Sequence, residues 1–170
     1  MNFQELVKER YSCRNISNKP VEPAIINKII DAAIKAPTAV NKQPIKIFQM
    51  QSEKAKQAIA KSCASTFGAS TFLIVGYKLS EGWVRSYDNR PFADIDGDIV
   101  ATHIMLQVSD LGLVTTWIGN FDAPLLKQMF PEMNEYELIA LFPIGYPADN
   151  ASPSKRHFER KGTDEILVNL

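Results

Sequence analysis

The sequence predicts a single domain in which helices cover both sides of a mixed β-sheet. Two observations carry this prediction. Strand-like segments alternate with helix-like segments along the chain, at 45–50, 71–77, 114–118 and 138–144. The segment 71–77 is also a continuous apolar run without alternation, which indicates a central strand buried on both faces. We assign residues 1–170 to this one domain, because a chain of 170 residues can bury a core of ordinary size.

The helices follow from apolar spacing and from the residues at their ends. Asn2 and Ser52 are N-cap residues, Pro23 stands where a helix begins, and Gly112 stands where one ends. Helices are therefore expected at about 2–10, 23–36, 52–64, 96–111 and 122–130. The second and fourth are apolar on more than one side, so they either cross the core or meet another subunit.

Composition excludes several function classes. The 19 basic side chains are balanced by 19 acidic ones, so a general electrostatic grip on nucleic acid is not expected. Cys13 and Cys63 stand apart, as do His103 and His157, which argues against structural zinc. The first residues lack a signal-peptide core, and no apolar run reaches bilayer length. We therefore expect a cytoplasmic protein without membrane contact.

The segment 36–44, Ala-Pro-Thr-Ala-Val-Asn-Lys-Gln-Pro, has the composition of a binding loop. Two prolines stop the neighbouring elements, while Thr38, Asn41 and Gln43 offer neutral hydrogen-bonding groups between small residues. This combination suits a flat polar ligand. An ordinary helix-to-strand connection would have the same composition.

Arg10, Ser12 and Arg14 alternate just after the first helix, so two guanidinium groups and a hydroxyl can converge on one anion. The planar, permanently charged guanidinium suits phosphate, which it binds through two hydrogen bonds. The plain alternative is that these arginines are solvated or bind the last carbonyls of the helix. No G-x-G-x-x-G or G-x-x-x-x-G-K-[ST] motif follows a predicted strand, so Rossmann and P-loop sites are not favoured.

Taken in order, Arg-x-Ser-x-Arg, an amphipathic helix and Ala-Pro-Thr-x-x-Asn-x-Gln-Pro resemble the nitroreductase family of FMN-dependent oxidoreductases. The resemblance extends over nearly the whole chain. It includes Asp96 with the long helix after it, Leu-Gly-Leu at 111–113, Trp-Ile-Gly at 117–119, Gly-Tyr-Pro at 145–147 and a basic tail. It implies a three-layer α+β fold and a domain-exchanged homodimer with FMN in a cleft at each end of the interface.

The resemblance also assigns roles to particular residues. It implies that Arg10 and Ser12 hold the phosphate and ribityl chain of FMN, and that Arg14 lies near the pyrimidine edge of the ring. A fixed cation there would stabilise the reduced flavin. Pro37, Thr38 and Asn41 are expected to line the flavin from the partner subunit, with Gln43 a weaker candidate.

Two further segments are implicated by the same resemblance. Ile118, Gly119 and Asn120 match the segment whose backbone N–H faces the hydride-accepting nitrogen of the ring; an ordinary strand end with a glycine turn explains them equally well. In the tail, Arg160 and Lys161 match a second phosphate contact. Lys155 and Arg156 are rivals, because nothing fixes the alignment after Pro147, and a solvated basic tail is the plain alternative.

The expected activity is NAD(P)H-dependent and ping-pong: NADH or NADPH reduces FMN, and a small acceptor such as a nitroaromatic, quinone or enone then takes the electrons. The alternatives are a non-catalytic FMN storage or sensing module and a reductase with a single acceptor. The chain departs from the family in placing Ser62 and Ser65 where Asn and Lys are common. The insertion that shapes the substrate pocket in longer members of the family is expected to be reduced here to about 83–92. His103 is expected to be a core residue rather than a catalyst.

Overall fold

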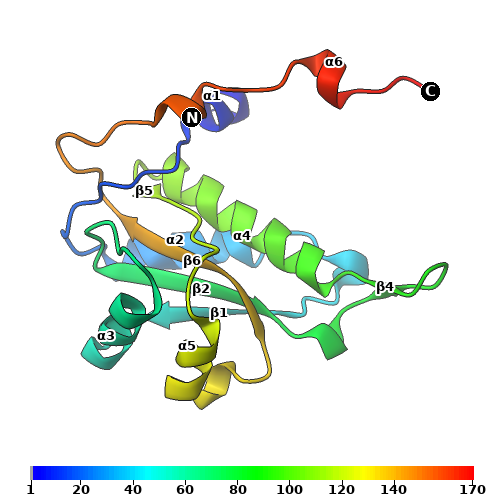
Figure 1. The fold of residues 1–170 in the computed structure, drawn as a ribbon, viewed down its shortest axis with the longest axis horizontal. Coiled ribbons are helices and arrows are strands. Elements are labelled where there is room, and N and C mark those ends of the chain that lie inside the picture. The colour runs from blue at the N-terminus through cyan, green and yellow to red at the C-terminus, as the bar shows by residue number, and fades with distance from the viewer. Residues whose placement is uncertain (1) are drawn as a thin grey trace.

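The computed structural model describes residues 2–170 and has three layers, with a four-stranded sheet between two layers of helices (Figure 1). Helices α2 (Pro23–Ala33) and α4 (Ala93–Asp110) pack on one face of the sheet. Helices α3 (Glu53–Ser62) and α5 (Ala123–Met129) pack on the other. The α+β class expected from the sequence, with helices on both sides of a sheet, is confirmed.

The strand order is β1 (Ile45–Met50), β2 (Thr71–Tyr77), β6 (Glu137–Gly145) and β5 (Val114–Thr115), and each neighbouring pair is antiparallel. The parallel component of this mixed sheet, within residues 2–170, is the bridge between Ser12 and Thr115. β2 is central, as its apolar run predicted. Its side chains alternate between the two cores, Leu73 and Val75 on the side of α4 and Phe72 and Ile74 on the other.

The strand predicted at 114–118 is interrupted. β5 ends at Thr115, and pairing resumes only at Ile118, which forms an isolated bridge with Leu141. In this register Thr116, the first residue of the gap, lies opposite Pro143, which has no N–H to donate to a ladder. The carbonyl of Pro143 instead accepts a hydrogen bond of 2.7 Å from Thr115 Oγ1. The proline therefore explains the gap.

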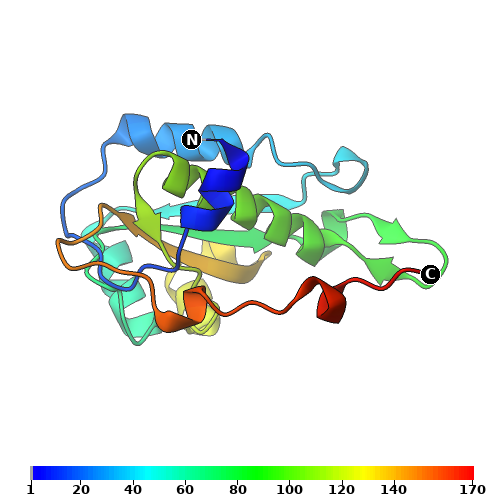
Figure 2. The same ribbon diagram turned by 90° about the horizontal axis from the view of Figure 1, so that it is seen from above.

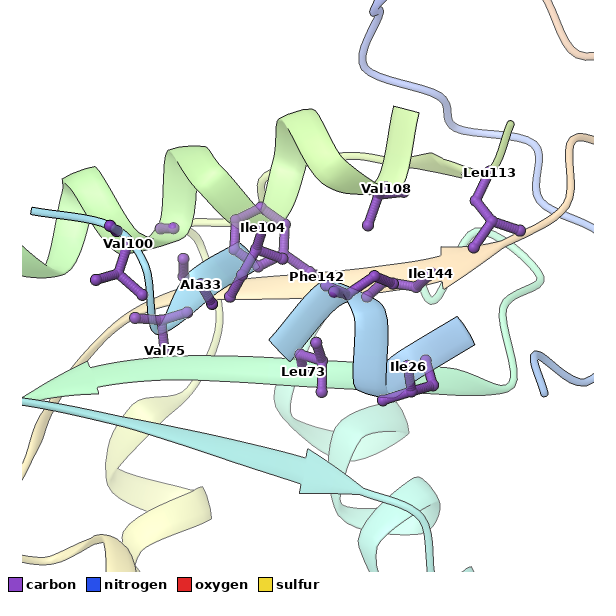
Figure 3. Close-up of a cluster of buried hydrophobic side chains, with 14 of the residues drawn as sticks. Ile26, Ala33, Leu73, Val75, Val100, Ile104, Val108, Leu113, Phe142 and Ile144 are labelled. Atoms are coloured by element: carbon purple, nitrogen blue, oxygen red, sulfur yellow. The ribbon is translucent and has the colours of Figure 1, made fainter. Parts of the chain in front are cut away.

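The larger core lies between the sheet and the pair α2 and α4 (Figure 3). Val100, Ile104 and Val108 recur along one side of α4 and face the strands, while Ile26 and Ala33 approach from α2. These side chains are almost entirely buried, at no more than 2% exposure. This core contacts α4 along its length and therefore fixes the positions of both ends of the helix, near which the candidate site residues lie.

The helix ends match the residues that predicted them. Asn2 Oδ1 accepts a hydrogen bond from the N–H of Glu5, Ser52 Oγ accepts one from Ala55, and Pro23 is the first residue of α2. The remaining elements are α1 (Phe3–Glu9), α6 (Thr163–Ile166), β3 (Val84–Arg85), β4 (Arg90–Pro91), and the 3₁₀ turns η1 (Ala39–Asn41), η2 (Leu79–Glu81), η3 (Pro131–Met133) and η4 (Lys155–His157).

Two segments project from the layers. β3 and β4 form a hairpin outside the main sheet, in the region 83–92 to which the substrate-shaping insertion was expected to be reduced. After β6 the chain returns to the segment that follows α1, where His157 of η4 meets Tyr11, and the tail then runs to the C-terminus clear of the layers (Figure 1 and Figure 2). Within residues 2–170, no helix combines the length and the apolarity that crossing a membrane requires.

Candidate cofactor site

In the extended segment after α1, the side chain of Cys13 points inward and separates Ser12 from Arg14. Cys13 is completely buried, and its N–H donates to the carbonyl of Thr115 at 2.9 Å. Ile16 is also buried and donates to the carbonyl of Phe67 at 2.8 Å. Ser12 and Arg14, on either side of Cys13, share the outer side of the segment, because the neighbours of an inward side chain in an extended chain point outward. The alternation read from the sequence therefore corresponds to a real face.

That face forms one wall of a pocket of about 630 Å³. The other wall comes from the tail, which is held in place by hydrogen bonds from Ser17 N–H to the Tyr146 carbonyl and from Ala148 N–H to the Asn15 carbonyl. The ring of His157 also meets the ring of Tyr11 edge-on, with 6.3 Å between centroids. The pocket is lined by Arg10, Ser12, Arg14, Ser154, Lys155, Arg156, His157 and Arg160.

The charge of this pocket is one-sided. Five of its lining residues are arginine or lysine and none is acidic. None of the five belongs to an ion pair recorded within residues 2–170. The pKa of Arg10 is lowered, first by burial and then by the positive charge of Arg160. Like charges held together without a counterion suit this pocket to an anion.

The predicted binding loop lies elsewhere. The N–H of Ala39 donates to Asp96 Oδ1 at 2.7 Å, which places the loop at the N-terminal end of α4. Arg10 instead lines a small hollow with Ser109, at the C-terminal end of the same helix. Asp96 and Ser109 are about 20 Å apart along the helix axis at 1.5 Å per residue. One chain therefore does not bring Pro37, Thr38 and Asn41 to the basic pocket.

The segment 118–120 forms a third group, next to α3. The N–H of Ile118 already donates to the carbonyl of Leu141 at 3.0 Å, so it is not available to a ligand. The N–H groups of Gly119 and Asn120 make no backbone hydrogen bond within residues 2–170, and both residues are exposed. A Cβ added to Gly119 would meet no atom within 4 Å. The N–H groups of Gly119 and Asn120 are therefore available to a ligand, and the space beside Gly119 is open.

Asn120 lines a second pocket, of about 430 Å³, together with Lys61, Ser62, Cys63, Ala64, Phe121 and Asp122. The sequence analysis did not single out Lys61 as a site residue. Lys61 belongs to a polar helix, and the sequence of that helix does not indicate that Lys61 lies next to the turn at 120–122. That proximity depends on a tertiary contact, the hydrogen bond of 2.6 Å from the Asp122 N–H to the Ser62 carbonyl.

In the tail, the structure distinguishes among the basic residues. Arg160 lines the pocket with the rivals Lys155 and Arg156, whereas Lys161 does not. His157 is a pocket residue that the sequence analysis considered only as a possible zinc ligand. His103 is half-buried on α4, with Nδ1 2.8 Å from the carbonyl oxygen of Ile99, and it lies outside the basic pocket.

Comparisons with known proteins bear on the family and the fold of this chain. The family model described as "Nitroreductase family" matches residues 7–71, which span the basic segment and the loop. The crystal structure of a nitroreductase family protein from Clostridium difficile 630 is 32% identical, with a TM-score of 0.90 over 99% of this chain and 98% of that one.

Two more distant proteins carry informative names. A protein of Methanothermobacter thermautotrophicus named "Putative NADH dehydrogenase/NAD(P)H nitroreductase" is 26% identical over 94% of this chain and 88% of its own. A "putative nitroreductase in complex with FMN" from Exiguobacterium sibiricum 255-15 is 22% identical, with a TM-score of 0.84 over 100% of this chain and 98% of that one. The full-length match to the Clostridium difficile protein decides the assignment: this chain belongs to the nitroreductase family.

Proposed function

We propose that this protein is an FMN-dependent oxidoreductase. In the proposed reaction, NADH or NADPH provides a hydride, and a small acceptor such as a nitroaromatic, a quinone or an enone receives it in a second half-reaction. The two substrates occupy the same cleft in turn, so the kinetics are ping-pong. The observation that carries the proposal is the basic pocket formed by Arg10, Ser12 and Arg14 with the tail.

The donor set of the pocket fits the phosphate of FMN. A phosphate dianion needs permanent cations and neutral donors, and the pocket supplies guanidinium groups and the hydroxyl of Ser12 without a competing carboxylate. The burial of Arg10 strengthens its interaction with an anion, because water screens it less. The Exiguobacterium sibiricum protein of the same fold forms a complex with FMN, which supports the same cofactor here.

Other residues suit the rest of the cofactor. When bound, FMN would supply two-electron redox chemistry between the hydride donor and the acceptor. Arg14, exposed at the pocket, is the cation that we assign to the pyrimidine edge of the ring, where negative charge develops on reduction. The N–H groups of Gly119 and Asn120 are the donors that we assign to the hydride-accepting side, and the open space at Gly119 allows close approach.

We further propose that the working form is a homodimer. The loop with Pro37, Thr38 and Asn41 lies at the opposite end of α4 from Arg10, so a cleft containing both needs the loop of a second chain. Exposed apolar side chains also call for a partner. They are concentrated in the tail, at Phe158, Ile166, Leu167, Val168 and Leu170.

The test starts with the visible spectrum of the purified protein before and after addition of FMN. Anaerobic stopped-flow with NADH and with NADPH then follows bleaching of the bound flavin, and acceptors from the three classes are added to the reduced protein. Bleaching followed by rapid reoxidation is expected. Absence of bound flavin after addition of FMN contradicts the proposal, and bleaching without turnover of any acceptor favours a storage or sensing module.

The dimer is tested separately by size-exclusion chromatography with light scattering on the flavin-loaded protein. A mass of twice 19.0 kDa is expected. A folded monomer that retains FMN would contradict the shared cleft, because a single chain cannot bring the loop and the basic pocket together.

A further inference from the structure

The loop between Thr38 and Gln43 has an unusual backbone. Val40, Asn41 and Gln43 have positive φ values of 46°, 57° and 51°. This left-handed region is tolerated by asparagine, but it is an outlier for a β-branched residue such as valine. Val40 is also 70% exposed, so packing of its side chain does not compensate for the strain. Something else must hold the loop in this conformation.

The contact that ties the loop to the core is made by Asp96. Its Oδ1 accepts a hydrogen bond of 2.7 Å from the N–H of Ala39, the residue just before the strained stretch. This distance is short for a backbone N–H and is typical of a charged acceptor. Asp96 is only 1% exposed, so the bond is shielded from water. It is therefore the strongest candidate for holding the loop.

A buried carboxylate is expensive to keep in a helix. Asp96 pairs with no cation recorded within residues 2–170, and its Oδ2 is buried without a hydrogen-bond partner there. Its place in the first turn of α4 offsets part of the cost, because the positive end of the helix dipole favours an anion. An apolar residue at this position would avoid the cost of burying a charge. The stabilisation that the Asp96 carboxylate provides must therefore come from its hydrogen bond to the loop.

The loop so held presents hydrogen-bond donors in a fixed arrangement. Thr38 Oγ1 accepts from the Gln43 N–H at 3.0 Å, which leaves the hydroxyl hydrogen of Thr38 free to donate outward. Asn41 Oδ1 accepts from Gln43 Nε2 at 3.1 Å, which leaves the amide nitrogen of Asn41 free to donate. Both donors suit the carbonyl and ring-nitrogen acceptors of a flat heterocycle.

We propose that Asp96 is a positioning residue that holds the Thr38–Gln43 loop in its strained conformation and so preorganises the donors of Thr38 and Asn41 for the cofactor. This inference rests on the proposed function, in which the loop lines the flavin bound by the partner subunit. Asp96 touches no ligand itself. Its action passes through the Ala39 N–H to the loop backbone.

The first experiment uses flavin-free protein, so it does not depend on FMN binding. Amide hydrogen exchange of the segment 36–44 is compared in wild type, Asp96→Asn and the matched control Asp98→Asn, whose exposed carboxylate lies two residues later on α4. Asn can still accept from Ala39, but it lacks the charge and places an N–H₂ group where Oδ2 has no partner. We expect exchange at least tenfold faster in this segment for Asp96→Asn, and wild-type exchange for Asp98→Asn.

The second experiment measures the FMN dissociation constant by quenching of flavin fluorescence. Asp96→Asn should raise it about tenfold. Adding Val40→Asn should restore much of the affinity, because asparagine adopts the left-handed region without the strain of valine. A purely structural role for Asp96 would not be rescued by a substitution in an exposed loop position.

The outcomes are distinct. Unchanged exchange in 36–44 for a folded Asp96→Asn protein overturns the inference, as does faster exchange spread evenly over α4 and the sheet. If Asp96→Asn does not fold, Ala39→Pro removes the donor from the loop side, where Thr38 already has the extended conformation that a following proline requires. Unchanged exchange at 40–44 in that variant also overturns it. Failure of wild type to bind FMN, with the exchange difference intact, contradicts the proposed function and not the role of Asp96 in the loop.

Discussion

Arg10 and Arg160 line the same pocket from opposite ends of the chain, and the charge of Arg160 adds to burial in lowering the pKa of Arg10. Two guanidinium groups that repel each other raise the free energy of the unliganded protein. An anion between them removes the repulsion and gains charge-assisted hydrogen bonds. The pair therefore favours an anion between the N-terminal segment and the tail.

The first prediction separates Arg160 from its neighbour in the tail. Arg160→Gln should raise the FMN dissociation constant about tenfold, which corresponds to about 1.4 kcal/mol and to the loss of one exposed charged contact. Lys161→Gln should raise it less than twofold, because Lys161 does not line the pocket. Fluorescence titration with FMN measures both.

Riboflavin, which lacks the phosphate, is the control ligand for this comparison. Its affinity should be the same for wild type and Arg160→Gln, since no phosphate contact is lost. A larger effect of Lys161→Gln than of Arg160→Gln would mean that the tail contacts the cofactor in another arrangement than the pocket indicates.

The second prediction concerns Arg14. Replacing it by alanine should lower the midpoint potential of bound FMN by about 30 mV, because a cation beside the reduced ring is lost; for a two-electron couple this is about 1.4 kcal/mol. Arg14 is exposed, and its recorded hydrogen bond within residues 2–170 is a long one of 3.4 Å to the Ser12 carbonyl, so the domain should stay folded. Redox titration of the loaded protein gives the potential. Arg14→Lys keeps the charge and should shift it less, and an unchanged potential in Arg14→Ala at full occupancy would refute the role.

The parts of the fold that the sequence predicted are those that local chemistry decides. The apolar run of 71–77 identified the central strand because a strand buried on both faces has no polar side. Helix starts were marked by Asn2, Pro23 and Ser52, because the first N–H groups of a helix have no acceptor within the helix. Asn2 and Ser52 supply a side-chain acceptor, and Pro23 has no N–H group that needs one. Arg10, Ser12 and Arg14 were grouped correctly in one wall because an extended chain alternates its side chains.

What the sequence did not predict depends on contacts between distant segments. No pattern after Pro147 indicates that His157 meets Tyr11, so the choice among the tail residues needed the structure. The gap after Thr115 arises from Pro143 on the opposing strand. Because valine normally avoids the left-handed region, nothing in the local sequence predicts the strained backbone at Val40. The contact of the loop with Asp96 joins residues far apart in the sequence and is not predicted either.

The third prediction uses the open space at Gly119. Because an added Cβ would meet no atom within 4 Å and the residue has no positive φ, Gly119→Ala should change the free energy of unfolding by less than about 0.5 kcal/mol. The same methyl group would lie in the way of a ring brought against the backbone, so FMN affinity should fall about tenfold. Gly145→Ala is the contrasting variant, since its Cβ would lie 2.6 Å from Ile16 Cγ2 and should destabilise the fold by about 1–3 kcal/mol.

Chemical denaturation of the flavin-free proteins and FMN titration of the folded ones measure the two effects. Normal flavin affinity in Gly119→Ala would show that the backbone at this position does not approach the cofactor closely, and the donors would then have to be sought elsewhere.

The last prediction concerns the β3–β4 hairpin and pH. The pKa of Asp88 is lowered by its hydrogen bonds with Arg85, which donates to it from Nε at 2.8 Å. Burial raises the pKa of Asp94, but the hydrogen bond and charge of Arg90 outweigh this and the net pKa is also lowered. A carboxyl group whose folded pKa lies below its unfolded value of 3.8 stabilises the folded state above that value. The contribution is lost as the pH falls through the lower, folded pKa.

The hairpin should therefore stay closed at neutral pH and loosen below about pH 4. Trp83 reports on this, because its ring packs edge-on against Phe92 with 5.1 Å between centroids, and Arg85 lies over the same Phe92 ring. Trp117→Phe leaves Trp83 as the sole tryptophan, and its fluorescence is followed from pH 6 down to about pH 2. Asp88→Asn in that background should already be loosened at pH 6 and should show a smaller change. A transition above pH 5, or the same transition in Asp88→Asn, would mean that other groups control the hairpin.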